Sequence, residues 1–446
     1  MSRPLFGLRA SRTDVRTEVL AGLTTFLTMA YIIFVQPAVL STDLAGKPTG
    51  LDFGAVLVAT CLASAFASIF MGLFARYPIA LAPGMGENFF FVSVVMSLTA
   101  LGISRPWQTA LGIVFLSGLA FLVLTVLKVR EALIDAISPS MRNGIAVGIG
   151  LFIAFIGLRS GGVIVAKSGT LVGLNVQAPP SDLAIFATGL VVAGVLSVRK
   201  VRGSLLWGIA AGTIVALGVG RIRVTGVFGL PSIAQPAAFQ MDVANALQPA
   251  LVPFIIVFLF MGLFDTVGTL LGVAEQAGFL VDNKLPRASR ALIVDATGIS
   301  VGAMLGTSTV TCYIESAAGV AAGGRTGLTS VVTGVLFLLA LLVSPLVAVI
   351  GTCQPITAPA LVLVGAMMMQ NARKIEWSEP SESIPAFLTV VGIPLAYSIA
   401  DGLAMGFVSY PVIKLLSGRG RDVRWLAYAI GALLVLYFAF VRNRLG

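Results

Sequence analysis

The chain contains no histidine, only three cysteines and few charged residues. Without histidine, proton transfer near neutral pH has to use carboxylates. The cysteines (Cys61, Cys312 and Cys353) cannot all pair and lack the spacing of metal ligands, so we interpret them as small apolar residues. No Walker A lysine motif is present, which argues against ATP hydrolysis. We therefore expect no enzyme, no bound metal and no organic cofactor.

Charge is scarce because the chain is strongly apolar. Of its 446 residues, 57% are hydrophobic and 11% are charged, whereas a soluble domain has about 25% charged residues. Mean hydropathy is +1.00, and several runs approach or exceed the roughly 20 apolar residues that cross a bilayer as a helix. These runs are too long for barrel strands. The sequence therefore predicts an all-α polytopic membrane protein, in contact with the lipid bilayer and without a cleavable signal peptide.

The apolar runs fall into two groups, separated by the polar stretch 221–246. The first group has predicted spans at 17–39, 52–75, 80–98, 107–128, 135–157, 182–198 and 204–220. The second has predicted spans at 247–273, 288–304, 308–322, 328–350, 355–370, 384–399, 402–417 and 424–441. We expect that two short neighbours near 384–417 do not both cross, which leaves about fourteen spans. Seven spans in each half would give the halves opposite orientations, as in an inverted repeat.

Basic residues favour a cytoplasmic N-terminus. With the N-terminus inside, most clusters of Lys and Arg between the spans would be cytoplasmic. These are Arg3, Arg9, Arg12, Arg16, Lys128, Arg130, Arg199, Lys200, Arg202, Lys284, Arg287, Arg290, Arg373 and Lys374. Arg221 and Arg223 do not fit this pattern, and an even number of spans places Arg442 and Arg444 inside. The net charge of +10 follows from this loop bias, so we expect no nucleic acid as a partner.

The third predicted span of each half is interrupted. The stretch "LAPGMGENFFF" at 81–91 contains a proline and two glycines, which disfavour a helix. The stretch "GTSTVTCYIES" at 306–316 is rich in β-branched residues, which favour a short strand. Non-helical backbone inside a membrane is tolerated only where it is buried in protein or lines a cavity. We therefore expect both stretches to line one binding site, with the following helices pointing their N-termini into it. The alternative is that proline and glycine only kink packed helices.

Carboxylates near the interruptions are candidate site residues, because an acid inside a bilayer costs about 2.5–3.5 kcal/mol. Glu315 and Asp265 are the candidates for substrate contact and proton coupling, since a carboxylate accepts hydrogen bonds from ring N–H and amino groups. The alternatives are an ion pair of Glu315 with Arg325 or another basic group, and a helix-terminal or threonine-paired Asp265.

Other polar residues have two interpretations each. Asn88 offers a donor and an acceptor to the edge of a heterocycle, or it caps the helix that follows. Asp295 is as consistent with an arginine pair as with function. We interpret Asp401 as a turn or cap residue and Glu275 as interfacial.

Several segments resemble the AzgA-like purine permeases of the nucleobase–cation symporter-2 superfamily, also called nucleobase–ascorbate transporters. These segments are "TEVLAGLTTFLTMAYIIFVQP", "LAPGMGENFFF", "LFDTVGTLLGVAEQAGFL", "LPRASRALIVDATG", "GTSTVTCYIESAAGVAAGGRTGLTSVVTG" and "IADGLAMGFVSY". The resemblance implies a uracil-permease-like fold of two inverted repeats, with short strands in spans three and ten that cross at the substrate site. It implies a core domain of 1–128 (spans one to four) and 247–350 (spans eight to eleven). It also implies a gate domain of 129–220 (spans five to seven) and 351–446 (spans twelve to fourteen), with 221–246 as the linker.

The function implied by the resemblance is proton-coupled import of adenine, guanine or hypoxanthine through the inner or plasma membrane, by a homodimer that contacts itself through the gate domain. By motif, Asn88 and Glu315 would contact the purine. Asp265 would be the second acid of the family pattern D-x-F-D-T, whose first acid is replaced here by Gly262. We hypothesise that Glu87 supplies the missing acid. The other substrate-contact candidates are Thr311, Cys312 and Tyr313.

Two other functions remain open from the sequence. One is an anion transporter of the same architecture, which acids beside the interruptions disfavour because they would repel an anion. The other is a receptor that binds a nucleobase without transporting it, which the loss of the acid at Gly262 keeps open.

Overall fold

The computed structural model describes residues 6–8, 11–43, 46–127, 138–167, 170–224, 226–279 and 285–440. The elements of the first half are α1 (Val15–Met29), α2 (Ile32–Ser41), α3 (Phe53–Phe70), the π-helix η1 (Met71–Ala75), β1 (Leu81–Pro83), α4 (Met85–Ala100), α5 (Pro106–Val126), α7 (Pro139–Ser160), β2 (Ile164–Lys167), β3 (Leu171–Leu174), α8 (Pro180–Val198) and α9 (Ser204–Gly218). The basic residues Arg3, Arg9, Lys128, Arg130, Lys284, Arg442 and Arg444, which entered the orientation prediction, lie outside the described residues.

The second half begins after the stretch 221–246. Its elements are α10 (Val243–Ala246), the 3-10 helix η2 (Pro249–Leu251), α11 (Val252–Ala277), α12 (Ala288–Leu305), β4 (Val310–Cys312), α13 (Ser316–Ala321), α14 (Gly327–Ala340), α15 (Ser344–Thr352), α16 (Gln354–Met368), the 3-10 helix η3 (Met369–Lys374), α17 (Pro380–Leu395), α18 (Ile399–Leu416), the 3-10 helix η4 (Gly420–Asp422) and α19 (Trp425–Phe440).

The helices have the length and composition of membrane spans. Among the described residues, eight helical segments are long and apolar enough to cross a membrane, and α4, α9 and α14 are shorter apolar helices. The chain is therefore a multi-pass membrane protein, as its composition predicts. The count of fourteen spans remains a prediction.

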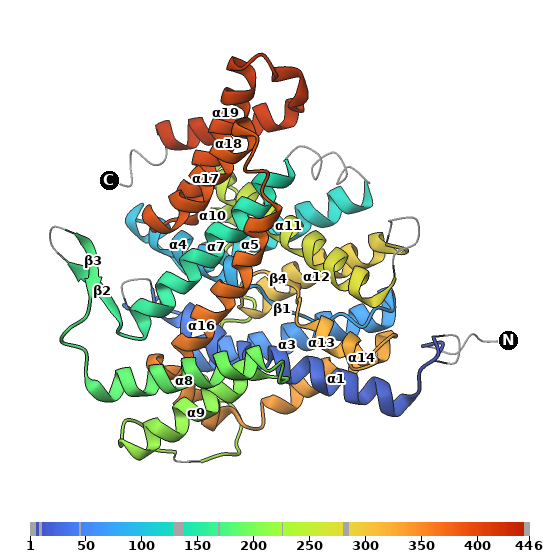
Figure 1. Ribbon diagram of the computed structural model, residues 1–446, viewed down its shortest axis with the longest axis vertical. Helices are drawn as coiled ribbons and strands as arrows, with labels where there is room; N and C mark the ends of the chain where they lie inside the picture. Colours follow the sequence, from blue (N-terminus) through green and yellow to red (C-terminus); the bar gives the residue numbers. More distant parts are fainter. Residues whose placement is uncertain are drawn as a thin grey trace.

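The helices pack in two sets. In one set, α7 packs against α16 and α17, α8 packs against α9 and α16, and α18 packs against α17 and α19. In the other set, α3 packs against α12 and α14, α1 packs against α13 and α14, and α5 packs against α11 and α12. Figure 1 shows β1 and β4 near the centre of the molecule, whereas the β2–β3 hairpin projects at its edge. The first sheet packs against α2, α3, α11 and α12.

The two interrupted stretches meet as a two-stranded antiparallel sheet. Its register pairs Leu81 with Cys312, Ala82 with Thr311 and Pro83 with Val310, and all six residues are buried. The ladder continues where the Gly84 amide donates to the Thr309 carbonyl at 2.9 Å. Pro83 lacks an amide hydrogen, and β-branched residues favour extended backbone, so both sequences prefer a strand to a helix here. The two stretches therefore lie together, as the sequence predicts, and a binding site beside them remains a prediction.

Two predicted spans are not single helices. The span 17–39 is divided into α1 and α2 at Ala30 and Tyr31. The span 328–350 is divided into α14 and α15, and the prediction of one helix there was wrong. Pro345 is the second residue of α15, and a proline disfavours helical backbone in the residue before it.

The stretch 221–246 is held at this break. The Gly229 amide donates to the Leu342 carbonyl at 2.9 Å, and the Ser344 hydroxyl donates to the Gly229 carbonyl at 2.8 Å. The stretch that separates the two halves is therefore anchored to the second half at the division between α14 and α15.

Candidate functional site

Asp265 lies beside the strand pair and is bound by a threonine of β4. The Thr311 hydroxyl donates to Asp265 Oδ2 at 3.2 Å, and it also lies 2.9 Å from the hydroxyl of Thr266. Asp265 is exposed although it belongs to an apolar helix of 26 residues, α11. The sequence allowed Asp265 to be a threonine-paired acid, and its partner is Thr311 of the interrupted stretch 306–316. An exposed carboxylate against the sheet can still accept a hydrogen bond from a ligand.

Glu315 follows β4 and is bound by a residue from the first half of the chain. Tyr31, at the break between α1 and α2, donates from its phenol hydroxyl to Glu315 Oε1 at 3.1 Å. Glu315 is only partly buried, and its neighbour Ile314 is 53% exposed.

The alternative of an ion pair between Glu315 and Arg325 is wrong. The Arg325 guanidinium donates instead to the carbonyls of Val320 and Gly324, at 2.7 and 2.8 Å. These carbonyls lie at the end of α13, where a cation is favoured by the helix dipole. Glu315 therefore has a neutral partner, which leaves its charge available to a ligand or a proton.

Asn88 is enclosed in a network of side chains that links the two halves. Its amide nitrogen donates to the Gln36 carbonyl oxygen, and its carbonyl oxygen accepts from the Ser308 hydroxyl. Gln36 in turn donates to the hydroxyls of Thr307 and Ser308 at 2.9 and 3.1 Å. Asn88 and Gln36 are fully buried. Asn88 lies inside the first turn of α4, whose N-cap is Gly84, so the interpretation as a helix cap is wrong.

Glu87 is buried in the first turn of α4, with 3% of its surface exposed. One carboxylate oxygen lies so close to Gly84 that a Cβ atom there would overlap it, and the Thr311 methyl group lies beside the same position. The acid that replaces an expected apolar residue thus lies at the strand pair.

Gly262, by contrast, leaves open space. A Cβ atom there would meet only Ile299 Cδ1 at 3.4 Å and Thr309 Cγ2 at 3.6 Å, which are ordinary contacts. An acid at this position would fit one turn before Asp265, beside the second interrupted stretch.

Asp295 is a further carboxylate beside the strand pair. It is fully buried in α12, with Oδ1 lying 3.9 Å from the Cys312 sulfur, and Oδ2 has no hydrogen-bond partner among the described residues. The interpretation as an arginine pair is wrong. A buried, unpaired carboxylate oxygen is costly, so this acid calls for a functional explanation. Its place in the helix that leads directly into β4 was the available signal.

The remaining two candidates hold the sheet together. The Tyr313 hydroxyl donates to the Pro83 carbonyl at 2.5 Å, which joins the end of β4 to β1. Cys312 is buried in β4, opposite Leu81. Both side chains therefore face protein.

The carboxylates beside the strand pair form no salt bridge among the residues that the structure describes. Among the described residues, the salt bridges are Arg221–Asp182, Lys414–Glu382 and Arg419–Glu379, all remote in sequence from the strand pair. The described part of the chain has no group of three or more His, Cys, Asp or Glu side chains placed to hold a metal ion. Around β1 and β4 there are instead carboxylates, threonine hydroxyls and a tyrosine. Such a set accepts hydrogen bonds and protons.

Glu275 lies three residues before Gly278, the C-cap of α11, and is exposed; its interfacial position stays a prediction. Asp401 lies in the first turn of α18, where Ser398 is the capping residue and accepts from the Asp401 amide at 3.2 Å.

The sequence matches the model of a permease family over residues 16–405. It is 48% identical to a putative permease of Methanocaldococcus jannaschii, covering 96% of each chain. It is 44% identical to the guanine/hypoxanthine permease PbuG of Bacillus subtilis, covering 96% of this chain and 98% of the other. It is 41% identical to the adenine permease AdeP of Escherichia coli, covering 99% and 96%.

Solved structures share the fold at much lower identity. The transmembrane domain of a cyanobacterial bicarbonate transporter, BicA, aligns with a TM-score of 0.59 at 17% identity, covering 88% of this chain and 97% of the other. The expected architecture of helices in a transporter fold is thereby confirmed.

Proposed function

Because the chain belongs to this permease family, and is a transporter and not an enzyme, we propose that it imports purine nucleobases together with protons by alternating access. One observation carries the proposal. The strands of the two halves meet, and the carboxylates of Asp265 and Glu315 lie beside them with neutral partners. The names of the guanine/hypoxanthine and adenine permeases among its relatives support a purine as the substrate.

Purine rings carry N–H and amino groups, which donate to carboxylates. We assign Glu315 and Asp265 as the substrate contacts and proton carriers, since both are accessible and neither is neutralised by a cation. The Asn88 side chain already hydrogen-bonds to Gln36 and Ser308, so we assign it to positioning the stretch 306–316 at the purine site. Thr311 holds the Asp265 carboxylate in place.

The two packing sets support the division into a core domain (1–128 and 247–350) and a gate domain (129–220 and 351–446). Movement of one set against the other would expose the purine site to alternate faces. We place the N-terminus in the cytoplasm, the chain in the cell (inner or plasma) membrane and the homodimer contact on the gate domain. In this orientation Arg221 lies outside, where its pairing with Asp182 accounts for an outer arginine.

An anion substrate is disfavoured by the acids at the site. The likeness to the bicarbonate transporter is one of fold, at 17% identity. Carboxylates beside the strand pair would repel a bicarbonate or sulfate ion, whereas they attract a hydrogen-bond donor. A receptor would bind a purine at the same site but would not move it across the membrane, so only a transport measurement separates it from this proposal.

The test is uptake by the purified protein in proteoliposomes. Labelled adenine, guanine, hypoxanthine, uracil and sulfate would be compared with and without an inward proton gradient. We expect concentrative uptake of one or more purines, only with the gradient. Uptake of sulfate alone would overturn the proposal in favour of an anion transporter. Purine binding without uptake would overturn it in favour of a receptor.

A further inference from the structure

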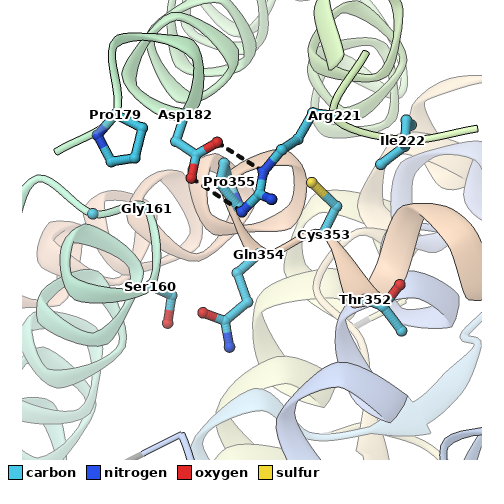
Figure 2. Close-up of a pocket in the computed structure, with 11 residues that line it drawn as sticks. Ser160, Gly161, Pro179, Asp182, Arg221, Ile222, Thr352, Cys353, Gln354 and Pro355 are labelled. Carbon is cyan, nitrogen blue, oxygen red and sulfur yellow. Dashed lines mark hydrogen bonds and ion pairs between the residues drawn. The ribbon is translucent and has the colours of Figure 1, made fainter. Parts of the chain in front are cut away.

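Two cavities adjoin each other at the boundary of the two packing sets, away from the acids of the site. The larger has a volume of about 340 Å³ and lies between the end of α7, the start of α8, the end of α9 and the junction of α15 with α16 (Figure 2). The smaller has a volume of about 170 Å³. Both are lined by Ser160 and Gln354, so the two cavities are neighbours, and together we call them the vestibule.

The smaller cavity brings the vestibule to α4, the helix that follows β1. Its lining includes the exposed Gly46 and also Phe89, which is 2% exposed and follows Asn88 in the chain. It is lined by α2 and α4 on one side and by α7 and α16 on the other. The larger volume lies within the roughly 300–1,000 Å³ of ordinary small-ligand pockets, and the smaller one is a neck.

Most polar groups of the vestibule are already occupied. Arg221 donates to both carboxylate oxygens of Asp182, at 3.0 and 3.3 Å. The Thr352 hydroxyl donates to the Ala348 carbonyl of its own helix at 2.9 Å. At the neck, Arg159 donates to the Tyr397 hydroxyl at 2.7 Å. These groups build the wall of the vestibule.

Gln354 differs from them, because its exposed side-chain amide has no hydrogen-bond partner among the described residues, and neither has the Ser160 hydroxyl. Figure 2 shows the Gln354 amide and the Ser160 hydroxyl pointing the same way, away from the Asp182–Arg221 pair. A free primary amide presents one donor and one acceptor in a plane. The same pattern pairs in two hydrogen bonds with the edge of a purine.

We propose that Gln354 and Ser160 form a vestibular binding site that captures a purine nucleobase before it reaches the acids at the strand pair. This rests on the proposed function and on its orientation, which puts the vestibule at the outer face. The site takes a planar heterocycle with an adjacent donor and acceptor on one edge. It selects among bases by hydrogen bonding, while Asp265 and Glu315 provide proton coupling.

The first experiment measures uptake by Gln354→Leu, which keeps the volume and removes the amide. Loss of one or two hydrogen bonds should raise the KM for purines roughly 2- to 10-fold, with little change in the maximal rate at saturating base. The matched control is Gln177→Leu, the same change in an exposed outer loop that lines neither cavity. An unchanged KM in Gln354→Leu would overturn the proposal.

The second experiment detects binding without transport. Thr352→Cys in a Cys353→Ser background puts one reactive thiol in the larger cavity, since Cys61 and Cys312 are buried. The rate of modification by a membrane-impermeant thiol reagent is measured with and without adenine or hypoxanthine. We expect protection by the base, and loss of that protection when Gln354→Leu is added.

The outcomes separate this inference from the transport function. Protection that survives Glu315→Gln, a change that removes coupling, supports the vestibular site independently of transport. Purine uptake by the wild type with no protection and no change in KM overturns the vestibular site and leaves the transport function standing. Protection without uptake supports the vestibular site and overturns the transport function.

Discussion

Tyr31 and Glu315 come from opposite halves of the chain and meet in a hydrogen bond of 3.1 Å between phenol and carboxylate. Tyr31 lies where the first apolar run breaks into α1 and α2, and Glu315 lies where β4 gives way to α13. Neither residue lies inside a regular helix or strand. The pair therefore positions an acid beside the strand crossing without neutralising it.

Replacing Glu315 with glutamine should abolish concentrative purine uptake. The amide keeps the shape but cannot carry a proton, and a charge-assisted hydrogen bond to the base is lost, which weakens binding roughly 10- to 100-fold. Gradient-driven uptake of adenine by Glu315→Gln in proteoliposomes measures this. Tyr31→Phe is the graded control, because it removes the neutral partner and leaves the acid. It should reduce uptake less, and an equal loss in both variants would show that Glu315 serves structure alone.

We predict that Glu87 supplies the acid that the family pattern places at position 262, where this chain has Gly262. Glu87→Leu should reduce purine uptake, and adding Gly262→Asp should restore part of it, because a Cβ atom at Gly262 meets only ordinary contacts. Uptake rates of the single and double variants test this. If Glu87→Gln transports normally while Asp265→Asn and Glu315→Gln are inactive, Glu87 does not compensate for the missing acid.

The crossing of the strands should not tolerate a side chain at Gly84. A Cβ atom there would overlap the Glu87 carboxylate and approach Thr311 Cγ2 to 2.7 Å. Gly84→Ala should therefore lower purine uptake about tenfold or more, as a small misplacement at a binding site does. Gly194→Ala is the matched control, because nothing lies within 4 Å of a Cβ atom at that glycine of α8. Equal uptake in both variants would contradict the close packing at Gly84.

Glu18 should contribute to stability and not to transport. Its buried carboxylate accepts hydrogen bonds from the Arg325 amide at 2.9 Å and from the Thr329 hydroxyl at 2.6 Å, at the start of α14. Glu18→Ala leaves these donors unpaired, which costs about 1–3 kcal/mol. The melting temperature in detergent should fall, whereas Glu275→Ala, at an exposed acid, should leave it unchanged. A normal melting temperature for Glu18→Ala would contradict the capping role.

The ion pair between Glu379 and Arg419 should give a small, pH-dependent stabilisation. Hydrogen bonds from Arg419 and Ser381 lower the pKa of Glu379 from its ordinary value of 4.5 to about 2. A depressed pKa gives stability that is present above the unfolded-state value and is lost as the pH falls towards 2. The difference in melting temperature between wild type and Glu379→Gln should be small at pH 7 and should vanish at low pH. High salt should also reduce it, because both side chains are partly exposed. A difference that grows on acidification would contradict this assignment.

The sequence was sufficient to predict the two breaks that form the strand pair, but not every helix break and not what each side chain contacts there. Proline, glycine and β-branched residues marked 81–91 and 306–316, and these stretches pair in the structure. The division between α14 and α15 was missed, although Pro345 was visible, because the surrounding residues are continuously apolar. Hydropathy indicates whether a segment lies in an apolar environment, and it does not detect a helix break of three residues.

The partners of the polar residues depended on packing between distant segments. Asn88 offers a donor and an acceptor to any neighbour, and only the fold brings Gln36 and Ser308 to it. Asp295 was judged by the arginines near it in sequence, but the helix turns its carboxylate towards Cys312. Local sequence thus identified the kinds of groups at the site, and tertiary structure decided which of them are left free for a ligand.

The most direct measurement is proton movement during purine uptake, recorded with a pH-sensitive dye trapped inside proteoliposomes. With the wild-type chain, addition of adenine or hypoxanthine should acidify the interior as the base enters. The double variant Glu315→Gln with Asp265→Asn should show neither acidification nor uptake of the base. Uptake of the base without acidification, or acidification by the double variant, would contradict the assignment of these two carboxylates as the coupled purine and proton site.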